Sequence, residues 1–233
     1  MSLLTIAGLN QSYGGSRILW DVDLEIQEGS RTCLMGRNGM GKTTLLKCIM
    51  GLLPTSSGTI LFEGTDLRPL PAEERAPLGI GYVPQGREIF PHLTVEENLQ
   101  VGLGVRPSGP ATIPPLIYDL FPVLKQMQHR RGGDLSGSQQ QQLAIGRALV
   151  LEPKLLILDE PTEGIQPNVV HEIGTILREL NTTLGVTLLL VEQKLPFARR
   201  VASDFRILEK GRVVANGPIE GLTGEIVADH LSV

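Results

Sequence analysis

The residues best suited to chemistry lie in Gly36–Thr44, where the chain reads GRNGMGKTT. This stretch fits G-x-x-x-x-G-K-[ST], the pattern of a loop whose backbone N–H groups surround the phosphates of a nucleotide. Its three glycines let the backbone approach phosphate oxygens without an intervening Cβ atom. Lys42 is placed to bridge the outer phosphates, and the Thr43 hydroxyl is placed to ligate Mg²⁺.

Two carboxylates, Asp159 and Glu160, directly follow the apolar run Leu155–Leu158. The run predicts a central parallel strand covered on both faces, and ligands of such sheets bind where the strands end. We expect Asp159 to hold Mg²⁺ and Glu160 to polarise an attacking water as general base. Pro161 predicts an extended backbone at Glu160. The alternative is an acidic turn without function, but a phosphate-binding loop needs such an acid to complete its metal shell.

Three other features fit either a nucleotide site or ordinary surface structure. Tyr13 lies in a turn and can stack on an adenine ring or simply be half exposed. Gln85 follows a short strand and can bind Mg²⁺ or the attacking water through its carbonyl, or be a solvated loop amide. Ser136 and Ser138 are candidate N-caps of a helix whose exposed start is also a possible anion site. The residues themselves leave these alternatives open.

The elements that position these groups alternate between strand and helix. Thr32–Met35 before the glycine loop reads as a buried strand, and Thr44–Met50 after it reads as a helix. That order argues against the alternative of a plain glycine-rich turn with a solvated lysine. Further strands are predicted at Ile80–Val83, Leu155–Leu158 and Thr187–Val191, and further helices at Val169–Leu180, Leu195–Ala202 and Glu225–Leu231. The alternation predicts an α/β fold with a parallel sheet.

Two regions differ from this alternation. Residues 1–30 look like antiparallel β-structure, most clearly at Asp21–Ile26, where apolar and acidic residues alternate. Residues 93–152 look helical, beginning with a capping box formed by Thr94 and Glu97. Additional segments are assigned as a strand at Gly58–Gly64, a polar connector at Pro69–Pro77, a loop at Gly102–Pro110, a helix at Pro115–Gln128 kinked or split by Pro122, and a hairpin at Arg206–Glu209 and Arg212–Ala215.

Bulk composition limits the possible partners. The 233 residues carry a net charge of −4, which gives no general attraction to nucleic acid. Cys33 and Cys48 flank the glycine loop, and we expect buried thiols rather than a disulfide, as in a reducing cytoplasm. Met1–Ile6 lacks the basic start and apolar core of a signal peptide, and no apolar run approaches the roughly 18 residues of a membrane span.

In this order the motifs resemble those of the ATP-binding subunits of ABC transporters, and the resemblance covers nearly the whole chain. The signature lies between the phosphate loop and the acidic strand, an order that excludes most other P-loop classes. The matching motifs are Tyr13 as the adenine-stacking aromatic, Gly36–Thr44 as Walker A, Gln85 as the Q-loop, Leu135–Gln139 as the signature, Leu155–Glu160 as Walker B and Thr162–Gln166 as the D-loop.

A narrower resemblance is to importers of branched-chain amino acids and of urea or short amides. It rests on three stretches, Pro84–Pro91, Glu160–Pro167 and Val191–Gln193. The glutamine at Gln85 leans toward the urea branch.

The resemblance implies a single domain over residues 1–233, with a RecA-like core and antiparallel β subdomain (1–92 and 153–233) and a helical subdomain (93–152). It implies an ATP hydrolase that uses ATP and Mg²⁺ at the cytoplasmic face of the inner (plasma) membrane. The implied partners are a second, usually different, ATPase subunit paired head to tail, two transmembrane permeases and, indirectly, a periplasmic solute-binding protein. The implied catalytic residues are Glu160, Lys42, Gln85 and Gln193, the metal ligands are Thr43, Gln85 and Asp159, and the ATP-binding residues are Tyr13, Gly36, Asn38, Gly39, Gly41, Lys42, Thr43, Thr44, Ser136, Gly137, Ser138 and Gln139.

Three residues depart from the family pattern. Ser138 replaces a glycine of the signature, and its side chain crowds the point where backbone should meet the γ-phosphate, so we expect weaker ATP-dependent pairing and slower turnover. Gln193 replaces the usual switch histidine and cannot carry a proton, so Glu160 would bear the base role alone. Gln166 replaces an acid of the D-loop, and no consequence follows from the sequence.

Two other classes compete with the importer subunit. A soluble ABC-type ATPase acting on nucleic acid, ribosomes or metal clusters is disfavoured by the acidic charge and by the single nucleotide motif. A small-molecule P-loop kinase is disfavoured by the signature-like helix start and by the acid pair Asp159–Glu160, since a kinase needs an acceptor pocket and usually an arginine-bearing lid.

Overall fold

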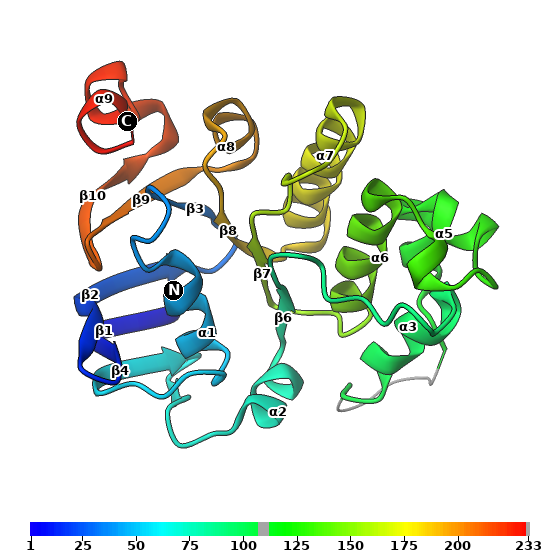
Figure 1. Cartoon of the computed structure of the whole chain (residues 1–233), viewed down its shortest axis with the longest axis horizontal. Coiled ribbons are helices and arrows are strands. Elements are labelled where there is room, and N and C mark those ends of the chain that lie inside the picture. The colour runs from blue at the N-terminus through cyan, green and yellow to red at the C-terminus, as the bar shows by residue number, and fades with distance from the viewer. Residues whose placement is uncertain (107–111, 232–233) are drawn as a thin grey trace.

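The computed structural model describes residues 1–106 and 112–231 as two sheets surrounded by helices (Figure 1). One sheet has the strand order β2-β1-β4-β5 and the other has the order β10-β9-β3-β8-β7-β6. The strands are β1 Ser2–Tyr13, β2 Ser16–Gln27, β3 Arg31–Met35, β4 Ser57–Phe62, β5 Thr65–Asp66, β6 Ile80–Val83, β7 Leu155–Asp159, β8 Thr187–Val191, β9 Asp204–Glu209 and β10 Arg212–Pro218.

The six-stranded sheet is parallel from β9 through β3, β8 and β7 to β6, and β10 adds an antiparallel edge. Its central strands β7 and β8 are buried on both faces, because successive side chains enter different cores. Leu156 and Leu158 of β7 pack with the helices on one side, whereas Leu155 and Ile157 pack with α1 (Lys42–Ile49) and the second sheet on the other. This confirms the predicted α/β fold with a central parallel sheet.

The four-stranded sheet is antiparallel, as predicted for the N-terminal region. β1 pairs with both β2 and β4, and Tyr13 pairs with Ser16 across the predicted turn. In β2 the residues from Val22 to Ile26 alternate between buried and exposed, so the apolar side chains face the core that this sheet shares with α1.

In Figure 1 the helices of the helical region lie to the right of the sheets, whereas α1 lies between the four-stranded sheet and the strands β7 and β6. The capping box is confirmed, since Thr94 Oγ1 accepts the Glu97 N–H and the Glu97 carboxylate accepts the Thr94 N–H. The split at Pro122 is also confirmed. The helices of this region are α3 Val95–Leu103, α4 Pro115–Leu120, α5 Pro122–Gln126, the 3-10 turn η2 Gly132–Asp134 and α6 Gly137–Leu149. The loop predicted at Gly102–Pro110 begins inside α3, and its residues 107–110 lie outside the described part of the chain.

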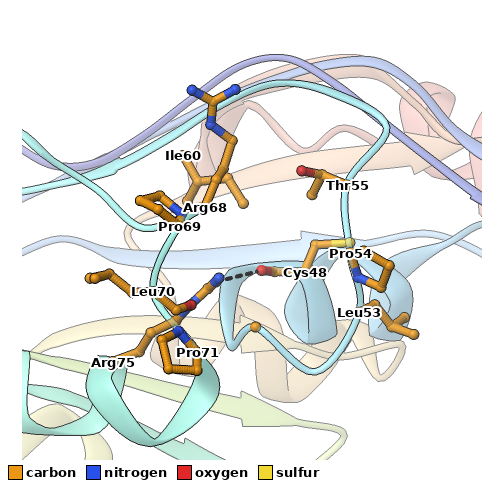
Figure 2. Close-up of a pocket in the computed structure, with 11 residues that line it drawn as sticks. Cys48, Leu53, Pro54, Thr55, Ile60, Arg68, Pro69, Leu70, Pro71 and Arg75 are labelled. Atoms are coloured by element: carbon orange, nitrogen blue, oxygen red, sulfur yellow. Dashed lines mark hydrogen bonds between the residues drawn. The ribbon is translucent and has the colours of Figure 1, made fainter.

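The prediction of a polar connector at Pro69–Pro77 is wrong, because α2 (Ala72–Arg75) and a 3-10 turn (Ala76–Leu78) occupy it. Arg75 explains the helix. Its buried guanidinium donates hydrogen bonds to the carbonyls of Leu70, Cys48 and Ile49 at 2.7–3.0 Å, and so closes the C-terminal end of α1 (Figure 2). A positive charge suits the negative end of a helix dipole. A pocket of about 340 Å³ lies beside Arg75. The buried charge in its lining is the Arg75 guanidinium, which is already hydrogen-bonded to backbone carbonyls.

The remaining predicted elements are present. α7 (Pro167–Leu184) is longer than predicted because Pro167 fits the first helical turn and Gly185 ends the helix in a left-handed conformation. The others are α8 Leu195–Val201, the β9–β10 hairpin, the 3-10 turn Ile219–Gly221 and α9 Gly224–His230. Cys33 and Cys48 are buried free thiols, as expected. Over residues 1–106 and 112–231, no helix combines the length and apolar character that a membrane span requires.

Candidate nucleotide-binding site

The glycine loop joins β3 to α1, and close contacts require glycine at Gly36 and Gly41. Gly36 has φ 147°, and a Cβ atom there would lie 2.3 Å from the carbonyl oxygen of Leu208. Gly41 precedes α1 with φ 104°, and its Cβ would lie 2.9 Å from the Leu19 side chain. Side-chain-bearing residues rarely adopt such φ values, so the loop path depends on these glycines. The path directs the start of α1 toward the cavity described below.

Lys42 is folded back into the loop. It is 5% exposed, and its ammonium donates hydrogen bonds to the carbonyls of Gly36 (2.8 Å) and Arg37 (2.9 Å). Burial lowers the pKa of Lys42, while the nearby carboxylates of Glu160 and Asp159 act in the opposite direction. The ammonium is thus held at the loop by neutral carbonyl oxygens, which a phosphate can replace.

A cavity of about 330 Å³ opens beside this loop and collects residues from four separate parts of the chain. Gln85 follows β6 and Glu160 follows β7, and the parallel pairing of these strands brings the two residues together. Ile18 of β2 was not anticipated; nothing in the sequence pattern places β2 against the loop. The lining consists of Ile18, Asn38, Gly39, Gly41, Lys42, Thr43, Thr44, Gln85 and Glu160.

Asp159 ends β7 beneath this cavity and is 1% exposed. Neither carboxylate oxygen makes a hydrogen bond of regular geometry among the described residues, although the Thr43 hydroxyl lies near enough to act on the carboxylate. Burial raises the pKa of Asp159 and the Glu160 charge adds to the rise, while the Thr43 hydroxyl and the Lys42 charge oppose it. A buried carboxylate without regular hydrogen bonds is unfavourable unless a cation or donor meets it. Hard oxygen groups on Asp159 and Thr43 fit a Mg²⁺ ion.

Glu160 has a left-handed backbone, with φ 49°. The extended conformation predicted from Pro161 is therefore wrong at this residue. The Glu160 N–H donates to the Val191 carbonyl at 2.9 Å, so pairing of the chain with the end of β8 overrides the local preference. Left-handed non-glycine residues carry strain of about 1–3 kcal/mol and concentrate at functional sites.

Two glutamine amides flank the Glu160 carboxylate. The Gln193 amide donates to Glu160 Oε1 at 2.5 Å and to Asn38 Oδ1 at 2.7 Å. The Gln85 amide donates to Glu160 Oε2 at 3.3 Å and to Glu163 Oε2 at 3.0 Å. Gln85 uses its NH₂ group in both of these hydrogen bonds, so its carbonyl oxygen is left for a metal or a water. Glu163 was missed by the sequence analysis because an exposed D-loop carboxylate has no distinctive pattern.

The signature residues do not line the cavity. Ser136 caps α6 in a capping box with Gln139, while Ser138 lies within the first turn, so the expectation that Ser138 is also a cap is wrong. Arg87 of the Q-loop lies against this helix start and donates to Gln140 at 3.4 Å. Tyr13 is 48% exposed and also lies outside the residues that line the cavity. Within one chain, the two predicted halves of an ATP site are therefore separate.

Comparison with known proteins identifies relatives over almost the whole chain. Residues 19–163 match the model of the family described as ABC transporter. The chain is 40% identical over 213 residues to the high-affinity branched-chain amino acid transport ATP-binding protein BraG of Pseudomonas aeruginosa, covering 91% of both chains. It is 38% identical over 221 residues to the probable branched-chain amino acid transport ATP-binding protein LivF of Archaeoglobus fulgidus, covering 92% of both.

Solved structures agree with this match. A dimeric bacterial ABC transporter cassette superposes with a TM-score of 0.85 at 26% identity, covering 94% of this chain and 99% of the other. The family match favours an ABC ATPase over the alternative of a small-molecule kinase.

Proposed function

This chain belongs to the ABC transporter family of ATP-hydrolysing subunits, and we propose that it powers an importer of a small polar solute. The observation that carries the proposal is the cavity at which the glycine loop, Gln85 and Glu160 meet. The residues around it can bind a triphosphate, hold its metal and activate a water.

Nucleotide binding would begin with the backbone N–H groups of the glycine loop and the start of α1. Lys42 would exchange its two carbonyl partners for the outer phosphates. Asp159, the Thr43 hydroxyl and the Gln85 carbonyl are the proposed metal ligands. Mg²⁺ supplies positive charge to the phosphate oxygens when it is bound.

Hydrolysis would use Glu160 to orient and polarise the attacking water. The Gln193 amide already contacts this carboxylate and would hold it toward the γ-phosphate. One loop supplies few donors for the charge that spreads over the transferring group, so additional donors are needed. We propose that they come from Ser136, Gly137, Ser138 and Gln139 of a second ATPase subunit paired head to tail.

The pairing proposal has support from the separation of the signature from the cavity within one chain and from the dimeric structural relative. We propose that the partner in the cell is a different ATPase subunit, as the family resemblance implies.

A second surface suits the permease. A groove of about 510 Å³ runs between the Q-loop and α3, and three of its apolar side chains are exposed, Phe90 by 44%, Val101 by 44% and Val105 by 40%. Soluble proteins bind an amphipathic helix in such grooves. We propose that a permease helix docks here, which would keep the chain peripheral at the cytoplasmic face of the membrane.

The solute is chosen by the permeases and, we propose, by a periplasmic binding protein. Branched-chain amino acids are the first candidate, because relatives that are 38–40% identical carry that description. Urea or a short amide is the second candidate, because the sequence Pro84-Gln85-Gly86 leans toward that branch. Transport assays of the assembled complex with labelled leucine and labelled urea distinguish the two.

The ATPase proposal is tested by titrating the purified chain with ATP and Mg²⁺. We expect saturable binding that Lys42→Ala greatly weakens; absence of binding by the parent chain would overturn the proposal. The permease proposal is tested by co-purification with the permeases encoded beside its gene. We expect Val101→Glu to abolish co-purification and the control Val214→Glu, at an equally exposed strand position, to preserve it. Equal retention of both variants would contradict docking in the groove.

A further inference from the structure

The side chain of Glu192 is a buried carboxylate to which the mechanism above gives no role. It follows β8 and is 2% exposed. Its Oε2 accepts a hydrogen bond from the Thr162 hydroxyl at 2.6 Å. Its Oε1 accepts the backbone N–H groups of Gln193 at 2.8 Å and Lys194 at 3.0 Å. A carboxylate is tolerated at such a depth when donors satisfy both oxygens, and here they do.

These donors come from two different loops. Thr162 belongs to the turn after β7, whereas Gln193 and Lys194 belong to the turn after β8. A second link joins the same two turns, because the Lys194 ammonium donates to the Thr162 carbonyl at 2.8 Å. Two side chains therefore connect the turns: the buried carboxylate of Glu192 and the exposed ammonium of Lys194.

The two turns carry the groups that meet at the reacting end of the site. Glu160 lies two residues before Thr162, and Gln193 directly follows Glu192. Strand pairing alone fixes β7 against β8 only as far as Asp159 and Val191. Beyond that point, the Glu160 N–H still donates to the Val191 carbonyl, and the two turns are then joined by the Thr162–Glu192 and Lys194–Thr162 hydrogen bonds.

We propose that Glu192, through Thr162, is a positioning residue that holds the Gln193 amide against the Glu160 carboxylate. The inference rests on the proposed ATPase function. Glu192 itself does not line the cavity; it acts by fixing the backbone at Gln193 and the turn after Glu160. A misplacement of about 1 Å in such an arrangement costs roughly 100-fold in rate.

The test removes the Thr162 donor while keeping the shape of the side chain. We expect Thr162→Val to lower kcat for ATP hydrolysis by about 10–100-fold, with ATP affinity within about 3-fold of the parent. Thr162→Ser should restore kcat, because a hydroxyl returns. Glu192→Gln should also keep most of the turnover, since its oxygen still accepts both N–H groups and its amide can donate to Thr162.

A matched control is available in the same sheet. The Thr32 hydroxyl donates to the Asp204 carboxylate at 2.9 Å, away from the cavity. Thr32→Val therefore removes the same kind of bond, and we expect it to lower the melting temperature without lowering kcat. If Thr162→Val does not fold, Lys194→Met is the second variant. Lys194 is exposed, and its loss removes the hydrogen bond to the Thr162 carbonyl. We expect Lys194→Met to lower kcat by about 3-fold or more at unchanged ATP affinity.

Three results would overturn the inference while leaving the ATPase proposal standing. The first is a parent-like kcat in Thr162→Val. The second is an equal kcat loss in Thr32→Val. The third is a Glu192→Gln variant as impaired as Thr162→Val, which would assign the effect to charge rather than position. A parent chain that neither binds nor hydrolyses ATP would instead overturn the proposed function itself.

Discussion

The side-chain amide of Gln193 lies 2.5 Å from the Glu160 carboxylate, although 33 residues separate them in the chain. The same amide nitrogen lies 2.7 Å from Asn38 of the glycine loop. One uncharged side chain thus joins the three loops that meet at the reacting end of the cavity. A histidine at this position could exchange a proton with the carboxylate, whereas the glutamine amide forms hydrogen bonds but does not exchange a proton at neutral pH. In the proposed mechanism, base catalysis at this site therefore depends on the Glu160 carboxylate alone.

Glu160→Gln keeps the shape of the side chain and removes its basicity. We expect hydrolysis to fall by roughly 10²–10⁴-fold while ATP binding survives. Phosphate release and equilibrium ATP binding measure the two quantities separately. Glu179→Gln, at an exposed position of α7, is the control and should behave like the parent. Normal turnover in Glu160→Gln would remove Glu160 from the mechanism.

Gln193→Ala removes the amide and should lower kcat by about 100-fold, the lower end of the range for a lost oriented donor. Gln193→His supplies a ring N–H and a proton-carrying group, so its turnover should equal or exceed that of the parent. Steady-state kcat and KM for both variants check this. If alanine and histidine variants are equally slow, contact with Glu160 is not what matters at this position.

Ser138→Gly restores the small residue of the family signature in the first turn of α6. We expect stronger ATP-dependent dimerisation and faster turnover, because the backbone gains room at the partner's γ-phosphate. Ser138→Ala separates the contributions, since it keeps the Cβ atom and removes the hydroxyl. Sedimentation in the presence of ATP, in the Glu160→Gln background, measures pairing. Unchanged pairing and turnover in Ser138→Gly would contradict the crowding argument.

The raised pKa of Asp159 would make the proposed binding of Mg²⁺ dependent on pH. Mg²⁺ needs the ionised carboxylate, so the gain in nucleotide affinity from Mg²⁺ should disappear as pH falls through this pKa, above the ordinary aspartate value of about 3.9. Because the folded state holds the proton more tightly than the unfolded state, the contribution of Asp159 to metal-free stability should decline as pH rises through the same range.

Asp159→Asn checks both statements. It should remove the Mg²⁺ dependence of nucleotide binding in calorimetric titrations. It should also raise the metal-free melting temperature at neutral pH, by about 2–4 °C for each 1 kcal/mol gained. A Mg²⁺ effect that persists in Asp159→Asn would exclude this carboxylate as a ligand.

Gly51→Ala should destabilise the protein through Arg75. Gly51 has φ 73°, and a Cβ atom there would lie 2.7 Å from the carbon of the Arg75 guanidinium that closes α1. Gly185→Ala is the matched control, with φ 71° and open space around the new Cβ. Both variants lose about 1 kcal/mol from the strained φ, and we expect Gly51→Ala to lose about 1–3 kcal/mol more in urea unfolding. Equal losses would mean that Arg75 moves aside without cost.

Local patterns in the sequence were sufficient for most elements. The alternating residues of β2, the apolar runs of β7 and β8, and the capping box at Thr94 each depend on residues a few positions apart, so they could be predicted. The glycine spacing likewise identified the phosphate loop. The helix at Ala72–Arg75 was missed because it is stabilised by hydrogen bonds from Arg75 to carbonyls 26 and 27 positions away, which no local pattern indicates.

The sequence by itself determined which residue types are present to bind phosphate, metal and water. Only the tertiary structure decided how they meet: Glu160 takes a left-handed backbone despite Pro161, Ile18 lines the cavity, and Glu192 joins the turns after β7 and β8. The physical reason is that these contacts follow from strand order. Strand order depends on how helices and the second sheet cover both faces of the central sheet with apolar side chains. It therefore cannot be predicted from any short stretch of sequence.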